Sequence, residues 1–138
     1  MTQSNTGSVD PAQVSETPRR ILVVDDSVDA AESMAMLLRL RGHEVLVAHN
    51  GYDALQMAAD SPPSVVLLDI GLPGINGYEV CRQLSQSGLE HVRIIAMTGY
   101  GLEQDRQRAR EAGFDVHTVK PVAFAVLVKL LAGENEAG

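Results

Sequence analysis

Apolar and polar positions follow one another in blocks along the chain, and the blocks predict alternating strands and helices. Short apolar runs such as residues 21–24 and 65–68 precede longer segments in which apolar residues recur every three or four positions. The runs are typical of buried strands and the longer segments of amphipathic helices. The expected strands are residues 21–26, 43–50, 64–69, 92–99 and 114–121, and the expected helices are 27–42, 51–63, 77–88, 102–113 and 122–133.

This order of elements predicts an α/β fold. Strands joined by helices of this length run parallel, in a doubly wound five-stranded parallel sheet with helices on both faces. Several strands are apolar throughout, which is expected where both sheet faces are covered. Functional sites of such sheets lie outside the carboxyl ends of the strands, so the ends of the strands are the place to look for chemistry.

The two ends of the chain differ in composition from the region between them. Residues 1–18 are rich in Ser, Thr and Gln, contain two prolines and have few large apolar groups. Such a segment buries too little apolar surface to offset its ordering entropy. We therefore expect a flexible tail at 1–18, one folded domain at 19–133 and a short polar tail at 134–138.

Charge and cysteine content narrow the class of protein. The net charge of −7 argues against a general binder of nucleic-acid backbones, which uses a basic face. A single cysteine, Cys81, excludes an internal disulfide framework and fits a reducing compartment. No apolar run reaches the roughly 18 residues that span a bilayer, and the start of the chain lacks a signal-peptide pattern. We expect a cytoplasmic protein that binds neither nucleic acid nor membrane.

Polar residues stand at the ends of four expected strands. Asp25 and Asp26 end the first strand, Asp69 the third, Thr98 the fourth and Lys120 the fifth. Because the carboxyl ends of central parallel strands meet at one edge of the sheet, we expect these side chains to converge. Two carboxylates about 4 Å apart repel each other by about 4 kcal/mol at an effective dielectric of 20. Protons or a divalent cation must relieve that repulsion.

Mg²⁺ is the natural counter-ion for such a group, because it binds through one or two carboxylates, waters and phosphate. An aspartate carboxylate can also accept a phosphoryl group and become an acyl phosphate. That reaction needs positive charge and a hydroxyl donor around the phosphate oxygens, which Mg²⁺, Lys120 and Thr98 would supply. Asp69 is therefore a candidate metal ligand, or a nucleophile beside a metal.

Four motifs carry a family resemblance. They are DD at 25–26, LLDIGLPGINGYE at 67–79, MTG at 97–99 and VKP at 119–121. Each is weak alone, but together, in this order at four strand ends, they resemble the receiver domain of two-component response regulators over about residues 20–132. The resemblance implies the flavodoxin-like (CheY-like) strand order 2-1-3-4-5. It also implies a signalling phosphoacceptor rather than an enzyme, with Mg-dependent self-phosphorylation and autodephosphorylation as its only reactions.

The resemblance assigns the phosphoacceptor and the metal ligands by position. Asp69 matches the phosphoacceptor. Asp25 and Asp26 match the acidic pair that holds Mg²⁺, with Asp26 as the more direct ligand. Asp69 itself and the backbone carbonyl of Gly71 complete the implied protein ligands.

The resemblance also assigns a switch. Thr98 matches the switch hydroxyl and Lys120 the lysine that pairs with the phosphoryl group, with a cis bond to Pro121. The family often has Tyr or Phe three residues before this lysine, and here the position holds His117. We expect His117 to act as the switch partner of Thr98.

The implied partners are proteins. A sensor histidine kinase or a phosphotransfer protein would donate the phosphoryl group, and the surface of the fourth helix, fourth strand and fifth strand would then control an unknown downstream protein. The chain ends soon after the fifth expected helix, and residues 97–122 are especially similar to receivers attached to hybrid histidine kinases. A stand-alone regulator and an offshoot of that group both fit the sequence.

Three other functions fit the sequence less well. A phosphatase with an aspartyl nucleophile would have a second acid two residues later, where this chain has Gly71. A flavodoxin-like cofactor domain would have a phosphate-binding loop after the first strand, where this chain has two acids. A degenerate receiver that only binds partners is disfavoured by the intact Asp, Thr and Lys set.

Several residues also have a plain structural interpretation. Asp25 and Asp26 could cap the first helix, because Asp is a favoured N-cap residue. Cys81 is expected to be a half-buried packing residue rather than a reactive thiol. His43 and His49 are expected to face solvent.

Overall fold

The short apolar runs form one parallel sheet in the computed structural model, which describes residues 18–88, 92–99 and 103–132, without the side chains of 103–105. The strands are β1 (Arg20–Val24), β2 (Glu44–Ala48), β3 (Val65–Asp69), β4 (Arg93–Thr98) and β5 (Val116–Val119). Their order is β2-β1-β3-β4-β5, and each neighbouring pair is parallel. The sheet confirms the predicted fold class and strand order.

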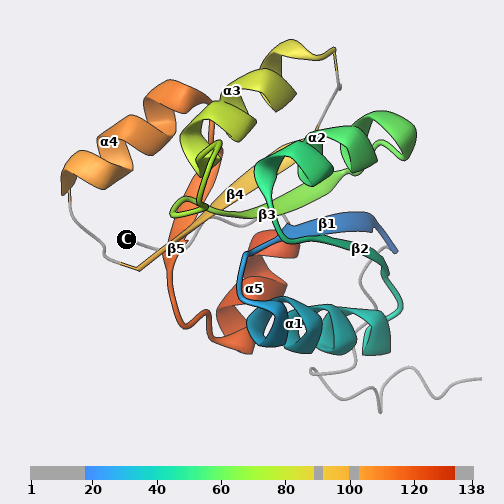
Figure 1. The fold of residues 1–138 in the computed structure, drawn as a ribbon. Helices are drawn as coiled ribbons and strands as arrows, with labels where there is room; N and C mark the ends of the chain where they lie inside the picture. Colours follow the sequence, from blue (N-terminus) through green and yellow to red (C-terminus); the bar gives the residue numbers. More distant parts are fainter. Residues whose placement is uncertain (1–17, 89–91, 100–102, 133–138) are drawn as a thin grey trace, which may run out of the picture.

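Helices cover both faces of this sheet. They are α1 (Val28–Leu40), α2 (Gly51–Asp60), α3 (Gly77–Gln86), α4 (Glu103–Ala112) and α5 (Phe124–Leu131). In Figure 1, α1 and α5 lie on one side of the sheet, and α2, α3 and α4 lie on the other. The chain therefore forms three layers, and the central strands are enclosed between two layers of helices.

Side chains alternate between the two faces of each strand, and they form two separate hydrophobic cores. On β1, Ile21 and Val23 pack with α1 and α5, while Leu22 and Val24 pack with α2 and α3. Strands β3 and β4 repeat this pattern in register with β1. Both faces of the central strands are thus buried, which is why their sequences are continuously apolar rather than alternating.

Side-chain caps fix where three helices begin. Ser27 caps α1 by accepting a hydrogen bond from the backbone N–H of Ala30. Asn50 and Asn76 cap α2 and α3 in the same way. The caps satisfy backbone donors that a helix start leaves without an intrahelical partner. Because Ser27 is the N-cap of α1, the capping role that was open for Asp25 and Asp26 belongs to Ser27 instead.

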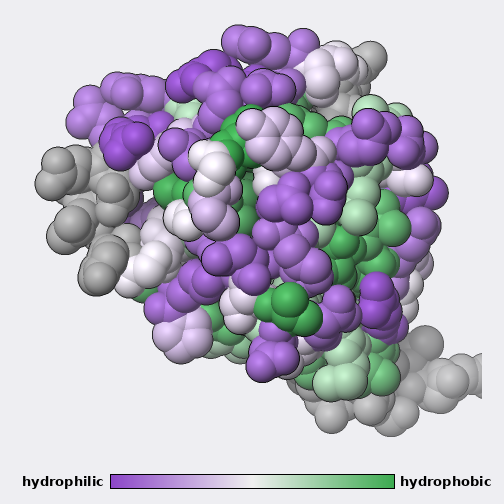
Figure 2. All heavy atoms as spheres, in the orientation of Figure 1, coloured by the Kyte–Doolittle hydropathy of each residue, from purple (hydrophilic) through white to green (hydrophobic). Residues whose placement is uncertain are grey.

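The outer surface is largely hydrophilic. On the face drawn in Figure 2, hydrophilic side chains cover much of α3 and α4, and hydrophobic residues show mainly between the helices. Large apolar side chains are also exposed on α1, among them Val28, Met36 and Leu40. No helix in the described part of the chain is both long and apolar enough to cross a membrane.

Candidate functional site

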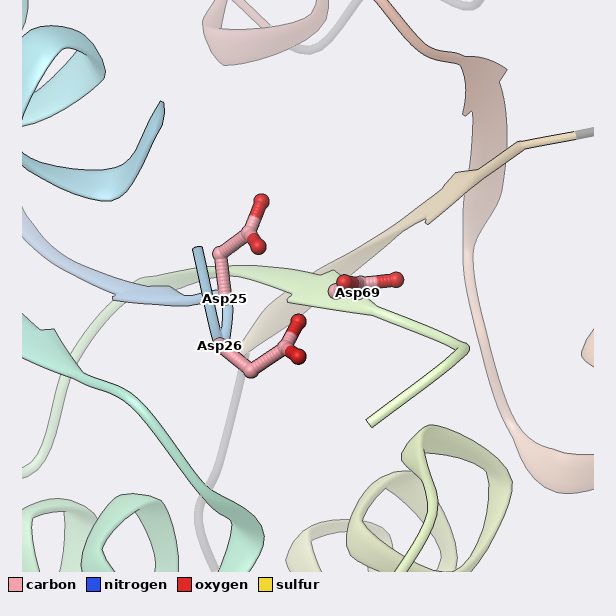
Figure 3. Close-up of side chains that lie close together, drawn as sticks. All are labelled: Asp25, Asp26 and Asp69. Carbon is pink, nitrogen blue, oxygen red and sulfur yellow. The ribbon is translucent and has the colours of Figure 1, made fainter. Parts of the chain in front are cut away.

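Three carboxylates meet where β1 and β3 end. Asp25 and Asp26 directly follow β1, and Asp69 is the last residue of β3, which pairs with β1. A carboxylate oxygen from each lies within 4.8 Å of the others. Figure 3 shows the three side chains gathered at this edge of the sheet. The predicted convergence of these three acids is confirmed.

The loop after β3 holds the Asp69 side chain in place. Asp69 is only 8% exposed, and its Oδ1 accepts a hydrogen bond from the backbone N–H of Gly71 at 2.9 Å. The loop then turns back onto the end of β3, where the N–H of Gly77 donates to the carbonyl of Ile70 at 3.1 Å. A Cβ at Gly77 would lie 2.6 Å from the Asp69 carbonyl oxygen. Only glycine fits this approach, so Gly77 allows the loop to close against the end of β3 beside Asp69.

Lys120 bridges two of the three acids. Its Nζ lies 3.0 Å from Asp25 Oδ2 and 3.4 Å from Asp69 Oδ2. The lysine follows β5 at the edge of the sheet, and its bond to Pro121 is cis, as the resemblance implies. A partly buried ammonium therefore already balances part of the negative charge of the site.

The surroundings raise the pKa values of both Asp69 and Lys120. Burial raises the pKa of Asp69, and the Asp25 carboxylate acts in the same direction; the Gly71 hydrogen bond and the charge of Lys120 oppose this shift only in part. Burial alone would lower the pKa of Lys120, but its hydrogen bond to Asp25 and its attraction to Asp69 outweigh burial and raise it. Lys120 is thus cationic at neutral pH, while the charged form of Asp69 is less favourable in the folded protein than in water.

A cleft of about 410 Å³ opens beside Asp69. Thr98, at the end of β4, and Lys120 also line it, so the cleft brings together the acid, the hydroxyl and the ammonium that the sequence predicted. Thr98 is buried, with 4% of its surface exposed. Tyr78 and Arg108 line the same cleft, and sequence analysis did not foresee either of them.

His117 lies on β5, opposite Ala96 of β4. Residues paired in register share a face of the sheet, and Ala96 packs into the core on the α2–α4 side. Thr98, two residues further along β4, faces the same side. His117 is half-buried there, which puts the two expected switch residues on one face of adjacent strands.

The acidic cluster suits a hard divalent cation. Its donors are carboxylate oxygens, which are the ligands that Mg²⁺ prefers. Asp26 is exposed and Asp69 faces the cleft, so water and phosphate oxygens can complete a coordination sphere. The cluster of Asp25, Asp26 and Asp69 therefore fits Mg²⁺.

The burial of three other residues differs from what the sequence predicted. His43 does not face solvent, because it is 4% exposed and its Nδ1 accepts a hydrogen bond from the Arg19 N–H at 3.1 Å. Cys81 is a packing residue but is fully rather than half buried, and that burial raises the pKa of its thiol to about 11. His49 is half-buried, and its Nδ1 lies 3.1 Å from the Asp25 carbonyl oxygen.

Known proteins resemble both the sequence and the fold. The family model of the response regulator receiver domain matches residues 21–132. Protein PilH of Pseudomonas aeruginosa is 35% identical over 113 residues, which cover 81% of this chain and 93% of that protein. Response regulator MprA of Mycobacterium ulcerans is 38% identical over 109 residues, which cover 79% of this chain and 47% of MprA. The chain thus spans about half the length of that relative.

Solved structures give the same picture. The chemotaxis protein CheY4 of Vibrio cholerae superposes with a TM-score of 0.78 at 27% identity, covering 83% of this chain and 97% of that one. A CheY-like receiver domain protein of Methanospirillum hungatei superposes with a TM-score of 0.79 at 26% identity, covering 85% and 93% of the two chains. Sequence and fold therefore point to one family.

Proposed function

The chain belongs to the response regulator receiver domain family, the phosphoacceptors of two-component signalling, and on that premise we propose that Asp69 takes the phosphoryl group. One observation carries the choice among the three acids. Asp69 lines the cleft together with Thr98 and Lys120. Asp25 lines the groove between α1 and α5 instead, and the exposed Asp26 does not line the cleft. A phosphoryl group on Asp69 would therefore stand in the open cleft, beside a hydroxyl and an ammonium.

The reaction is a displacement at phosphorus. A carboxylate oxygen of Asp69 forms a bond to phosphorus, the bond from phosphorus to the donor breaks, and an acyl phosphate remains. The donor is the phosphohistidine of a sensor histidine kinase or of a phosphotransfer protein, and the leaving group is its imidazole nitrogen. Lys120 Nζ lies 3.4 Å from Asp69 Oδ2, which supports a pairing of its ammonium with the transferred phosphoryl oxygens.

Mg²⁺ is proposed as the cofactor of this step. Asp26 and Asp25, with Asp69 and the carbonyl of Gly71, would hold the ion. When bound there, Mg²⁺ would neutralise part of the negative charge on the phosphate oxygens. Two groups of the chain itself orient the Asp69 carboxylate. The Gly71 N–H donates to Oδ1 at 2.9 Å, and the Lys120 ammonium donates to Oδ2 and balances its negative charge.

The phosphoryl group would act on a partner protein through α4, β4 and β5. Thr98 ends β4 and lines the cleft. If its hydroxyl moves towards the phosphoryl group, the end of β4 next to the surface of α4, β4 and β5 changes. Such a change shifts the population of two surface states rather than creating a new fold. We propose a protein as the downstream target; the small activities of the chain itself are Mg-dependent self-phosphorylation and autodephosphorylation.

Intact mass measurement after incubation with Mg²⁺ and phosphoramidate tests this proposal. The protein is expected to gain one phosphate, and Asp69→Ala to gain none. Asp60→Ala removes an exposed acid at the end of α2 and is the matched control, expected to behave like the unchanged protein.

Metal dependence is measured in the same experiment. Chelator should abolish the adduct, and Asp26→Ala should require far more Mg²⁺ for the same yield while still accepting the same donor. A full adduct on Asp69→Ala would refute the assignment of the phosphoacceptor, and equal yield in chelator would refute the role of the metal.

A further inference from the structure

Arg108 brings a second positive charge to the cleft of Asp69. It lies on α4 and lines the cleft with Lys120, but it has no part in the chemistry described above. Its guanidinium carbon lies 4.2 Å from the centre of the Tyr78 ring, which is a cation–π contact. The Tyr78 ring in turn packs edge-on against Phe114, with centroids 6.4 Å apart. A buried aromatic pair thus supports an exposed cation at the wall of the cleft.

Two of the acids near Arg108 on α3 and α4 have other hydrogen-bond or ion-pair partners. Glu79, which follows Tyr78 in α3, pairs with Arg82. Glu111 on α4 accepts a hydrogen bond from Gln107 at 3.3 Å. The Arg108 guanidinium therefore lies against an aromatic ring and lines the cleft, where it is accessible to an anion.

Phosphorylation would change the charge that Arg108 faces. The Asp69 carboxylate carries one negative charge, and a phosphoryl group carries up to about two near neutral pH. Lys120 is already shared between Asp69 and Asp25. A guanidinium binds phosphate through paired hydrogen bonds, which are stronger than a cation–π contact at an exposed position. A phosphoryl group on Asp69 would therefore be a stronger partner for Arg108 than the Tyr78 ring.

We propose that Arg108 leaves the Tyr78 ring and binds the phosphoryl group on Asp69, as a second cationic contact beside Lys120. The inference rests on the proposed phosphorylation of Asp69. Because Arg108 belongs to α4, this contact ties α4 directly to the occupancy of the site, in addition to any movement of Thr98.

NMR of the arginine side chains tests the movement. In the free protein, the Nε–H proton of Arg108 should show a ring-current shift from Tyr78. Beryllofluoride with Mg²⁺, as a phosphoryl mimic, should remove that shift, whereas Mg²⁺ alone should leave it unchanged. Arg106, an exposed arginine on the same helix that does not line the cleft, is the control and should not respond. An Arg108 signal that keeps its shift with the mimic bound would overturn the proposal.

Phosphorylation kinetics test the role of the charge. Arg108→Met keeps the length of the side chain and should raise the half-saturating phosphoramidate concentration about tenfold, the usual scale for one lost hydrogen bond to a charged group. Arg108→Lys restores the charge and should recover most of this loss. Arg106→Met changes the net charge equally and should have no effect.

The outcomes separate this inference from the proposed function. If the unchanged protein gains no phosphate on Asp69, the proposed function fails and this inference fails with it. If the unchanged protein is phosphorylated but Arg108→Met has the same half-saturation, only the role of Arg108 is overturned. An equal loss in Arg106→Met would show a general effect of net charge and would also overturn it.

Discussion

The Asp69 carboxylate is charged in a place that disfavours its charge. Burial and the neighbouring Asp25 raise its pKa, and Lys120 offsets this only in part. A raised pKa means that the folded protein binds this proton more tightly than the unfolded chain does, so Asp69 reduces stability as pH rises through its titration. Asp69→Asn removes the charge and should raise the melting temperature by a few degrees at pH 7 in chelator.

The pH dependence of that difference is the decisive measurement. Near pH 3, Asp69 is largely protonated and as neutral as the asparagine, so the two proteins should have the same melting temperature. The difference in melting temperature should increase as pH rises and then stay constant. Saturating Mg²⁺ should reverse the order, because it stabilises the unchanged protein through a ligand that the variant lacks. A variant that melts lower than the unchanged protein in chelator at pH 7 would show that the ion pair with Lys120 outweighs burial.

The sequence predicted positions that depend on sheet topology, but not those that depend on the packing of helices or on contacts between distant residues. The convergence of Asp25, Asp69 and Lys120 follows from a topological rule, because the ends of parallel strands meet at one edge of the sheet. The stacking of Arg108 on Tyr78 depends on how α4 lies against α3, and no local pattern encodes this. His43 was wrongly expected at the surface, because its partner is the backbone of Arg19, which is distant in sequence.

At the scale of elements, the sequence located every helix and strand of the described chain, but it extended their ends. β1 was expected to include Asp25 and Asp26 and instead ends at Val24. Asp25 already forms the turn into α1, since its Oδ1 accepts from the Ser27 N–H at 2.9 Å. Apolar periodicity therefore located the elements, whereas the polar hydrogen bonds that end them were not readable from it.

Thr98 and His117 lie on adjacent strands and on one face of the sheet, so a coupled movement is expected. A Thr98 hydroxyl drawn towards a phosphoryl oxygen leaves space beside β5, and the half-buried His117 ring can turn into it. A full reversal from 1:99 to 99:1 needs roughly 5.5 kcal/mol of differential stabilisation, and a partial shift needs less. Beryllofluoride with Mg²⁺ should therefore change the NMR signals of the His117 ring.

The coupling has a matched control on the same sheet. Thr98→Ala should abolish the response of His117 to beryllofluoride. Thr118→Ala removes a hydroxyl from a threonine that is buried on the opposite face of β5, where its partner Met97 packs with α1 and α5. That variant should retain the response. An unchanged His117 signal in the unaltered protein, or a full response in Thr98→Ala, would show that the pair is not coupled.

At the scale of the whole molecule, the described part of the chain is held together by two aliphatic cores, one on each side of the sheet. We propose that the N-terminal boundary of this domain lies close to Arg19. The Arg19 N–H donates to His43 at 3.1 Å, and the Arg19 carbonyl accepts from the Glu44 N–H at 3.0 Å. Residue 19 is therefore tied to the sheet by its backbone, whereas residues 1–17 lie outside the described chain.

We expect residues 1–17 to add nothing to stability, because their composition offers few apolar groups to bury. A variant that starts at Pro18 keeps the Arg19 nitrogen as an amide, so its bond to His43 survives, and its melting temperature should stay within about 2 °C of the full chain. A variant that starts at Ile21 loses both Arg19 bonds and the ion pair of Arg20 with Glu44. It should melt several degrees lower, which shows that the assay detects a docked segment. A loss of several degrees in the Pro18 variant would mean that residues 1–17 pack on the domain, and the proposed boundary would then have to move towards the N-terminus.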